Sequence, residues 1–264
     1  MGIEEMKWSY QMNQIQIKRG DCLELMEEIL DESIDMILCD LPYQVTGKHW
    51  DVAIPFDELW EHYKRIIKRG GVIALFCKQP FTSDVVRSNL DWYRYELIWE
   101  KDKGTDFGNA NRKPLNAHEN IEIFYNAQPT YNKQMREGKP YVKKNYRNND
   151  NDDLNFTSDN SGVWINNGER TPISVIKIAR DNIHKGRNLH PTQKPVALLE
   201  YLIKTYTNEG ETVLDNCMGS GSTGVACINE NRNFIGYELN EEYFNIAQNR
   251  LREAWKEKHK NKAT

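Results

Sequence analysis

The sequence predicts an α/β protein whose mostly parallel, doubly wound sheet is circularly permuted and carries an inserted region. Three observations lead to this fold class. Strand-length apolar runs alternate with helix-length segments through the first hundred residues, which is the pattern of βαβ units. A Gly-rich turn, which follows the first strand of an ordinary doubly wound sheet, here follows a strand that begins only at Thr212. Between Asn126 and Asn188 the periodicity fades.

The elements of the first half follow one another in a regular order. Strands are short apolar or β-branched runs, and helices repeat apolar residues at three- and four-residue spacing. In chain order we expect a strand near Gln14–Lys18, a helix near Cys22–Leu30, a strand at Ile34–Cys39, a helix at Asp57–Lys68, a strand at Val72–Cys77, a helix at Thr82–Leu90, and two strands, Arg94–Glu100 and Ile121–Tyr125, joined by the polar loop Asp102–Asn120.

The second half supplies the elements that the permutation needs. We expect a helix at Val196–Tyr206, a strand from Thr212, a helix after the Gly-rich turn, a strand at Asn233–Glu238, and a helix from Glu241 to about Lys256. Only one strand follows the Gly-rich turn, so the remaining strands must come from the N-terminus. The order would run from the Thr212 strand to the Asn233 strand, then through space to the Gln14 strand and on to the Ile34 strand. Domains with neighbouring termini tolerate such a permutation.

Three segments result from this organisation. Residues 1–126 and 189–264 would form one α/β domain, and residues 127–188 would be an insert within it. The polar tract Asn148–Asp153 marks a turn-rich surface inside the insert. A chain of 264 residues is long enough for such a domain and its insert.

Composition limits the environment and the chemistry. No apolar run approaches the roughly 20 residues of a membrane span, so we expect a soluble, cytoplasmic protein without a membrane partner. The cysteines are odd in number and lack Cys-x-x-Cys spacing, which favours reduced, buried thiols over zinc or disulfides. We therefore expect no metal; the five cysteines are Cys22, Cys39, Cys77, Cys217 and Cys227.

A tetrapeptide at the end of a buried strand is the first candidate site. Asp40-Leu41-Pro42-Tyr43 follows the apolar run that ends at Cys39. In open α/β sheets ligands bind outside the carboxyl ends of the strands. A carboxylate and a backbone carbonyl there can accept the two hydrogens of an amino group on a planar ring, and an aromatic side chain can stack on that ring. Taken alone, the tetrapeptide is more readily explained by a strand that ends in a Pro-Tyr turn, and a second site must decide between the two.

The Gly-rich turn is the second candidate site. Asp215 ends a strand, Gly219 and Gly221 allow close approach of a ligand to the backbone, and a helix begins beyond them. The spacing Gly219-x-Gly221-x-x-Gly224, with Glu238 at the end of the next strand, also fits a dinucleotide fingerprint, so a nicotinamide cofactor is a rival. Asp215 would repel a pyrophosphate but suits the amino group of a methionine moiety, which favours S-adenosylmethionine.

Together these motifs resemble a known family. The acid-x-Pro-Tyr element, a variable region, His190-Pro191-Thr192-Gln193-Lys194-Pro195 and then the Asp215–Gly221 loop resemble, in this order, the β-class amino-methyltransferases of DNA. The resemblance implies a Rossmann-like, S-adenosylmethionine-dependent methyltransferase sheet, with the insert as a target-recognition region. It also implies that Asp40, Leu41, Pro42 and Tyr43 are catalytic. Leu41 departs from the proline of many members, but a residue that acts through its carbonyl keeps its acceptor.

The same resemblance implies a set of cofactor-binding residues. Asp21 and the backbone of Cys22 would meet the adenine, Glu238 the ribose and Lys194 the methionine carboxylate; the full set is Asp21, Cys22, His190, Thr192, Lys194, Asp215, Cys217, Gly219, Ser220, Gly221 and Glu238. Taken alone, Asp21 is best explained as a turn or a helix N-cap, but the permutation favours the cofactor contact. For the His190–Pro195 segment, a turn before a helix is the alternative. His118-Glu119 also resembles a family segment, but both side chains are readily explained as surface residues and we assign them no catalytic role.

A basic stretch in the insert is the candidate DNA contact. The net charge of −4 requires any contact with DNA to be local. From Tyr131 to Arg147, lysines, arginines and tyrosines interleave around a single acid, Glu137. A solvated charge run is the usual explanation of such a stretch, but the context favours phosphate contacts by Lys133, Arg136, Tyr141, Lys143, Lys144 and Arg147.

The function predicted from the resemblance is methyl transfer from S-adenosylmethionine to N6 of a flipped adenine in double-stranded DNA. Asp40 favours adenine because cytosine-N4 members of the family commonly have serine at that position. A cytosine-N4 enzyme, a methyltransferase for RNA or a protein amide, a nicotinamide-dependent oxidoreductase and a DNA-binding protein with a vestigial cofactor site remain alternatives. Two partners are left open: a second copy of the chain in a homodimer, and a cognate restriction endonuclease.

Overall fold

The structure is a computed structural model that describes residues 14–42, 54–144, 163–181 and 193–260. Its internal contacts divide the chain into two compact units. The first consists of residues 1–132 and 174–264, and the second is Lys133–Ile173. The first unit contains both candidate motifs.

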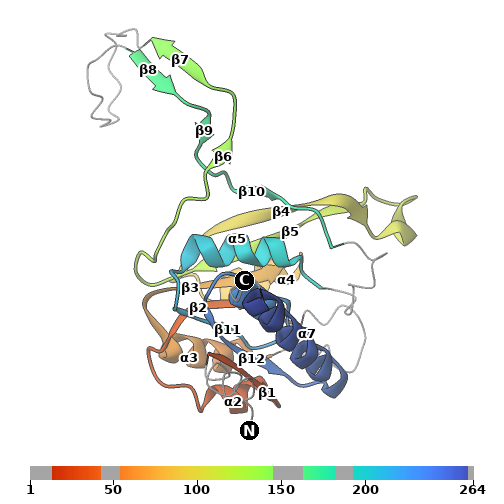
Figure 1. Cartoon of the computed structure of the whole chain (residues 1–264). Coiled ribbons are helices and arrows are strands. Elements are labelled where there is room, and N and C mark those ends of the chain that lie inside the picture. Colours follow the sequence, from red (N-terminus) through yellow and green to blue (C-terminus); the bar gives the residue numbers. More distant parts are fainter. Residues whose placement is uncertain (1–13, 43–53, 145–162, 182–192, 261–264) are drawn as a thin grey trace. The chain divides into compact units, whose positions relative to one another are not determined.

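The first unit is built on one eight-stranded sheet (Figure 1). Its spatial order is β1-β12-β11-β2-β3-β5-β4-β10. All neighbouring strands are parallel except that β5 is antiparallel to both β3 and β4. The strands are β1 (Ile15–Arg19), β2 (Ile34–Cys39), β3 (Ile67–Cys77), β4 (Tyr93–Thr105), β5 (Asn116–Phe124), β10 (Val175–Lys177), β11 (Thr212–Asp215) and β12 (Asn233–Glu238).

This order confirms the permuted fold. When β11, β12, β1, β2 and β3 are counted as the first to fifth strands of a doubly wound sheet, their spatial order becomes 3-2-1-4-5. The expected order of strands is wrong at one step if it is read as a list of neighbours in the sheet. The Ile34 strand, β2, pairs with β11 and not with β1. The chain returns to the other side of β11 and so creates a switch point at the carboxyl edge, where such sheets bind ligands.

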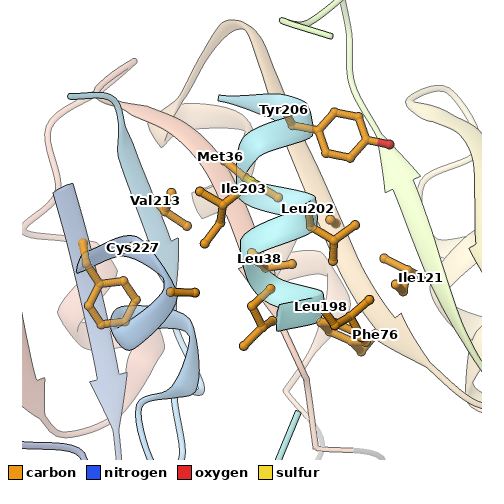
Figure 2. Packing of buried hydrophobic residues seen from close by; sticks show 14 of the residues in the cluster. Met36, Leu38, Phe76, Ile121, Leu198, Leu202, Ile203, Tyr206, Val213 and Cys227 are labelled. Carbon is orange, nitrogen blue, oxygen red and sulfur yellow. The ribbon is translucent and has the colours of Figure 1, made fainter. Parts of the chain in front are cut away.

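Helices cover both faces of the sheet. On one face lie α2 (Cys22–Met26), α3 (Phe56–Ile66) and α4 (Phe81–Ser88); on the other lie α5 (Val196–Tyr206), α6 (Ser222–Asn229) and α7 (Glu241–Lys260). Side chains alternate along β2, so Met36 and Leu38 face α5 while their neighbours face α3. Figure 2 shows Leu198, Leu202 and Ile203 of α5 packed over these β2 residues. Burial on both faces explains why β2 is continuously apolar from Met36 to Cys39.

Several elements differ in length from the expectation. Helix α2 ends at Met26 and not near Leu30, and the chain turns through a left-handed Glu32. Strand β3 begins five residues earlier than expected because Ile67 already pairs with Ile34. The β4–β5 hairpin extends far beyond Glu100 and closes through a short 3-10 helix, η1 (Phe107–Asn109). Cross-strand pairing satisfies the backbone hydrogen-bonding groups of these polar segments, which the sequence alone predicts to be loops.

The second unit contains two short antiparallel ladders. In one, β6 (Arg136–Glu137) pairs with β9 (Glu169–Arg170), and in the other, β7 (Tyr141–Lys144) pairs with β8 (Val163–Asn166). The unit falls within the expected insert of residues 127–188, but Val175–Lys177 joins the main sheet as β10. Among the residues that the structure describes, no helix is long and apolar enough to cross a membrane.

Candidate active site

Four acids stand at the carboxyl ends of four neighbouring strands. Because the sheet order is β1-β12-β11-β2, these acids follow one another as Asp21, Glu238, Asp215 and Asp40. The pairing of Arg19 with Glu238, of Gly236 with Asp215 and of Leu214 with Ile37 places these strand ends side by side. Residues up to 217 positions apart in the sequence, Asp21 and Glu238, thus belong to one acidic row along the edge of the sheet.

Asp40, at the β2 end of the row, is held by a lysine from another segment. Its Oδ2 accepts a hydrogen bond from Nζ of Lys194, which lies just before α5. The side chain of Asp40 is 24% exposed, whereas that of Lys194 is only 8% exposed. Leu41 is buried in the core cluster that includes α3, so the chain leaves the sheet directly after the acid. Tyr43, the last residue of the motif, lies outside the described residues.

Lys194 contacts a second acid, Glu119 of β5, at 3.4 Å. The other oxygen of Glu119 contacts Nζ of Lys101 in β4 at 2.5 Å. Burial alone lowers the pKa of Lys194, but Asp40 and Glu119 outweigh it and raise that pKa above its ordinary value. Burial raises the pKa of Glu119, but Lys194 and Lys101 outweigh it and hold that pKa below its ordinary value. Both groups are therefore charged at neutral pH.

These contacts bear on two predictions made from the sequence, one about Glu119 and one about Lys194. Glu119 is not an ordinary surface residue, because its side chain is only 15% exposed between two lysines. The neighbouring His118 is exposed, as expected. For Lys194 the structure provides a carboxylate partner within the protein itself, Asp40. That it binds a methionine carboxylate stays a prediction from the resemblance.

The Gly-rich loop is shaped by Asp215. Its Oδ1 accepts from the backbone N–H of Cys217 at 3.1 Å, and its Oδ2 accepts from the hydroxyl of Thr223 at 2.6 Å. Asp215 is 4% exposed, and burial raises its pKa to about 7. Gly219 and Gly221 have φ values of 51° and 78°, which L side chains rarely adopt. Among the described residues, a Cβ added to Gly219 would meet nothing within 4 Å, so the loop faces open space there.

Glu238 and the start of α2 contact the same loop. The Oε2 atom of Glu238 accepts from the N–H of Gly219 at 2.9 Å, and its Oε1 accepts from the N–H of Asn240 at 2.8 Å. Asp21 caps α2 by accepting from the N–H of Leu23 at 2.8 Å. The alternative reading of Asp21 as an N-cap is confirmed, and contact with an adenine stays a prediction. Cys22 lies beside the loop, where its sulfur accepts from Asn216 at 3.6 Å.

The structure adds several side chains that sequence reasoning missed. Gln193 contacts the hydroxyl of Ser220 at 3.3 Å and so joins the segment before α5 to the Gly-rich loop. Arg250 of α7 donates to the carbonyl of Ser220 at 2.6 Å and to its hydroxyl at 2.8 Å. Tyr63 of α3 donates to Asn216 at 2.6 Å. Gln193 lies within the His190–Pro195 motif, whereas no motif in the sequence marks Arg250 or Tyr63.

The remaining predicted residues fall elsewhere. His190 and Thr192 lie outside the described residues, as does Arg147. In the second unit Lys133, Arg136 and Lys143 are exposed, and Arg170 lies over the ring of Tyr141 with its Cζ 4.8 Å from the ring centroid. For Lys144 only the backbone, in β7, is described. Whether these residues contact DNA stays a prediction.

The chemistry of the acidic row limits what it can bind. Its four carboxylates attract amino groups, hydroxyls and cations, and they repel a pyrophosphate. Within the described part of the chain, no group of three or more His, Cys, Asp or Glu residues could hold a metal ion. The edge therefore suits an elongated ligand that has amino and hydroxyl groups along its length.

Comparison with known proteins agrees with this geometry. A family model described as DNA methylase matches residues 34–249. The type II methyltransferase M.HinfI of Haemophilus influenzae is 30% identical over 90% of this chain and 68% of its own length. The DNA adenine methyltransferase YhdJ of Escherichia coli K12 is 27% identical over 89% of this chain and 82% of its own. The crystal structure of the M1.HpyAVI–SAM complex shares the fold, with a TM-score of 0.61 and 24% identity over 90% of this chain and 98% of that one.

Proposed function

The chain belongs to the DNA methylase family, and from this premise we propose that it transfers a methyl group from S-adenosylmethionine to N6 of adenine in double-stranded DNA. One observation carries the proposal: Asp40, the acid proposed to be catalytic, stands at the end of the same acidic row that suits the cofactor. The names of the relatives, an adenine methyltransferase among them, support the choice of reaction.

The acidic row fits S-adenosylmethionine along its whole length. Asp21 would meet the adenine amino group, Glu238 the ribose hydroxyls and Asp215 the amino group of the methionine moiety. These roles fall in the spatial order of the strands, β1, β12 and β11, so an extended cofactor would end beside β2 and Asp40. A nicotinamide dinucleotide would bring its pyrophosphate against Asp215 and is disfavoured.

The residues around Asp40 would carry the chemistry. When bound, S-adenosylmethionine supplies an electrophilic methyl group. The adenine must leave the base stack before its N6 can reach this edge of the sheet, at a cost of about a few kcal/mol. Asp40 and the carbonyl of Leu41 would accept hydrogen bonds from the amino group and stabilise the positive charge that develops on it, while Pro42 and Tyr43 fix the base. The reaction needs no covalent nucleophile.

The methylated base is the direct test of the proposal. We expect DNA from a methylation-free bacterium that expresses this chain to contain N6-methyladenine at one sequence context, as read by sequencing and by digestion to nucleosides. The same DNA from cells that express the Asp40→Ala variant serves as the control. Recovery of N4-methylcytosine would contradict the adenine assignment, and recovery of no methylated base would contradict the function.

Cofactor affinity should depend on pH through Asp215. Burial raises the pKa of this acid to about 7, and the amino group of the cofactor needs the ionised carboxylate. Affinity should therefore fall as the pH drops below about 7, by roughly tenfold per pH unit at most. Calorimetry at pH 6.0 and 7.5 measures this change. In Asp215→Asn the affinity should be low and independent of pH; a pH dependence that persists in this variant would assign it to another group.

The second unit is proposed as the target-recognition region. Its exposed lysines Lys133, Lys139 and Lys143 suit phosphate contacts. Replacing all three by alanine should weaken DNA binding and reduce the slope of log affinity against log salt by up to about 2.7, since each lost phosphate contact contributes about 0.9. The methylated sequence should stay the same, because phosphate contacts carry no base code. Binding measured over a salt series tests both points.

A matched control uses exposed lysines of the first unit. The triple variant Lys18→Ala, Lys64→Ala and Lys256→Ala removes the same charge and should leave the salt slope unchanged. If the second-unit variant also leaves the slope unchanged, its lysines are only a solvated surface. The DNA contact would then move to the tip of the β4–β5 hairpin, where Phe107 is 67% exposed near the exposed Lys103 and Arg112.

Partners and location follow from the proposed substrate. The type II names of the relatives support a cognate restriction endonuclease, which co-expression and a restriction assay would reveal. A homodimer is the other proposed partner, and sedimentation would measure it. The proposed substrate, cellular DNA, supports a location in the cytoplasm of a bacterium or of a phage-infected host.

A further inference from the structure

Two buried lysines and two acids form a chain of contacts. One of the two acids is Asp40, the proposed catalytic acid, and the chain ends there. In order, the members are Lys101, Glu119, Lys194 and Asp40, so their charges alternate and sum to zero. They come from four separate segments: β4, β5, the residues before α5, and the end of β2. The side chains of both lysines are only 8% exposed.

The surroundings hold both lysines in place. Nζ of Lys194 lies 5.0 Å from the centroid of the Phe76 ring, at the end of β3, and Nζ of Lys101 lies 5.1 Å from that of Trp99. An ammonium over an aromatic face is attracted by the ring. A buried ammonium is costly unless it is paired, and Asp40 and Glu119 provide the pairing for Lys194. These contacts hold the ammonium of Lys194 against the carboxylate of Asp40.

We propose that Lys194 is a positioning residue for Asp40 and that Glu119 balances the charge of Lys194. In this proposal, which rests on the proposed methyl transfer, neither Lys194 nor Glu119 is a cofactor ligand. A carboxylate can accept about four hydrogen bonds, so the bond with Lys194 and one with the target amine can be made together. The bond with Lys194 fixes the plane of the Asp40 carboxylate. This fixed plane presents the acceptor to an amine whose approach has to be aligned with the methyl group.

Glu119 has an electrostatic role in the same group of side chains. Positive charge develops on the target amine during methyl transfer, and an unbalanced lysine beside Asp40 would oppose it. With Glu119 present the chain of four groups is neutral. Without it the net charge of the group becomes positive, and the transition state is destabilised relative to the bound substrate.

The first test compares cofactor affinity with turnover. Lys194→Met keeps most of the side-chain volume and removes the charge. We expect kcat to fall about 10- to 100-fold, the range typical of residues that orient a functional group, while the calorimetric Kd for S-adenosylmethionine stays within about twofold of the wild-type value. Lys194→Arg keeps the charge and should recover most of the lost rate. A merely structural residue would give neither the kcat-specific loss nor the recovery.

A matched control is Lys204→Met on α5. Lys204 pairs with Glu230 at 3.3 Å and is 41% exposed, so this variant removes a lysine–glutamate pair that is not part of the contact chain. Its kcat and its Kd for S-adenosylmethionine should equal those of the wild type.

A double-mutant cycle tests whether Glu119 acts through Lys194. Glu119→Gln alone should lower kcat, but in the Lys194→Met background it should have little further effect, because the lysine that it balances is gone. Additive losses would show that Glu119 acts independently and would overturn its assigned role.

The outcomes separate this inference from the proposed function. If Lys194→Met weakens S-adenosylmethionine binding and has a normal kcat at saturating cofactor, Lys194 binds the cofactor and the inference is wrong. If kcat is unchanged and binding is unchanged, the inference is also wrong. If the wild-type enzyme methylates no DNA, the proposed function itself fails, and the affinity measurement still reports whether Lys194 contacts the cofactor.

Discussion

Asp40→Ala should lower the rate of methyl transfer by about 10²–10³, the typical cost of removing one preorganised group that stabilises developing charge. The variant removes the acceptor for the target amine and leaves Lys194 with Glu119 alone. Asp40 directly follows β2, whereas the acids proposed to bind the cofactor stand at the ends of the three neighbouring strands β11, β12 and β1. Affinity for S-adenosylmethionine should therefore stay within about twofold. Single-turnover methyl transfer and calorimetry measure the two quantities.

Two further variants sharpen this test. Asp40→Asn keeps the shape but loses the charge, and it should lose nearly as much rate as alanine if the carboxylate charge is what matters. Asp84→Ala removes an exposed acid from α4 and should be indistinguishable from wild type. Normal turnover in Asp40→Ala would remove Asp40 from the catalytic machinery.

Glu238→Ala should weaken S-adenosylmethionine binding by roughly 10- to 100-fold. The lost interaction is a hydrogen bond to a charged group, for which typical values are about 1.5–3 kcal/mol. Glu238 also holds the N–H of Gly219, so the variant loosens the Gly-rich loop as well as removing a contact to the ribose. The rate at saturating cofactor should change much less than the affinity. Calorimetry measures the first effect and single-turnover kinetics the second.

Glu238→Gln separates the two roles of this residue. The amide oxygen of glutamine can still accept from the N–H of Gly219, so an intermediate affinity would assign the remaining loss to the ligand contact. Glu241→Ala provides the control, because Glu241 is exposed and pairs with Arg19 at 2.7 Å. An unaltered affinity in Glu238→Ala would exclude this acid from the cofactor site.

Much of the fold and of the site could be read from the sequence, because the relevant signals are local. Each signal depends on a few consecutive residues. The structure has three such elements at the predicted positions: the apolar run of β2, the Gly-rich turn after β11 and the helix Val196–Tyr206. The fold class followed from the order of these signals, and Asp40 and Asp215 were recognised because each directly follows or ends a buried strand. Propensity, side-chain alternation and turn chemistry act over such short distances.

Contacts between distant segments could not be read in the same way. The row of four acids depends on β2 lying beside β11, and the sequence succession alone suggests β1 as the neighbour of β2. The sequence around Glu119 predicts a surface residue, because nothing near it shows that two lysines enclose its side chain. Strand β10 is three residues long and exists because β4 offers it an edge.

The sequence by itself therefore determined the layered α/β class, the permutation and the two motifs, all of which depend on local pattern and order. Only the tertiary structure decided which partner each functional group has. Lys194 is 154 positions from Asp40, and the two meet because the fold brings the residues just before α5 to the carboxyl end of β2. Pairing of buried charges is set by the geometry of packed elements: burial makes an unpaired charge costly, but the sequence does not state which opposite charge will lie within reach.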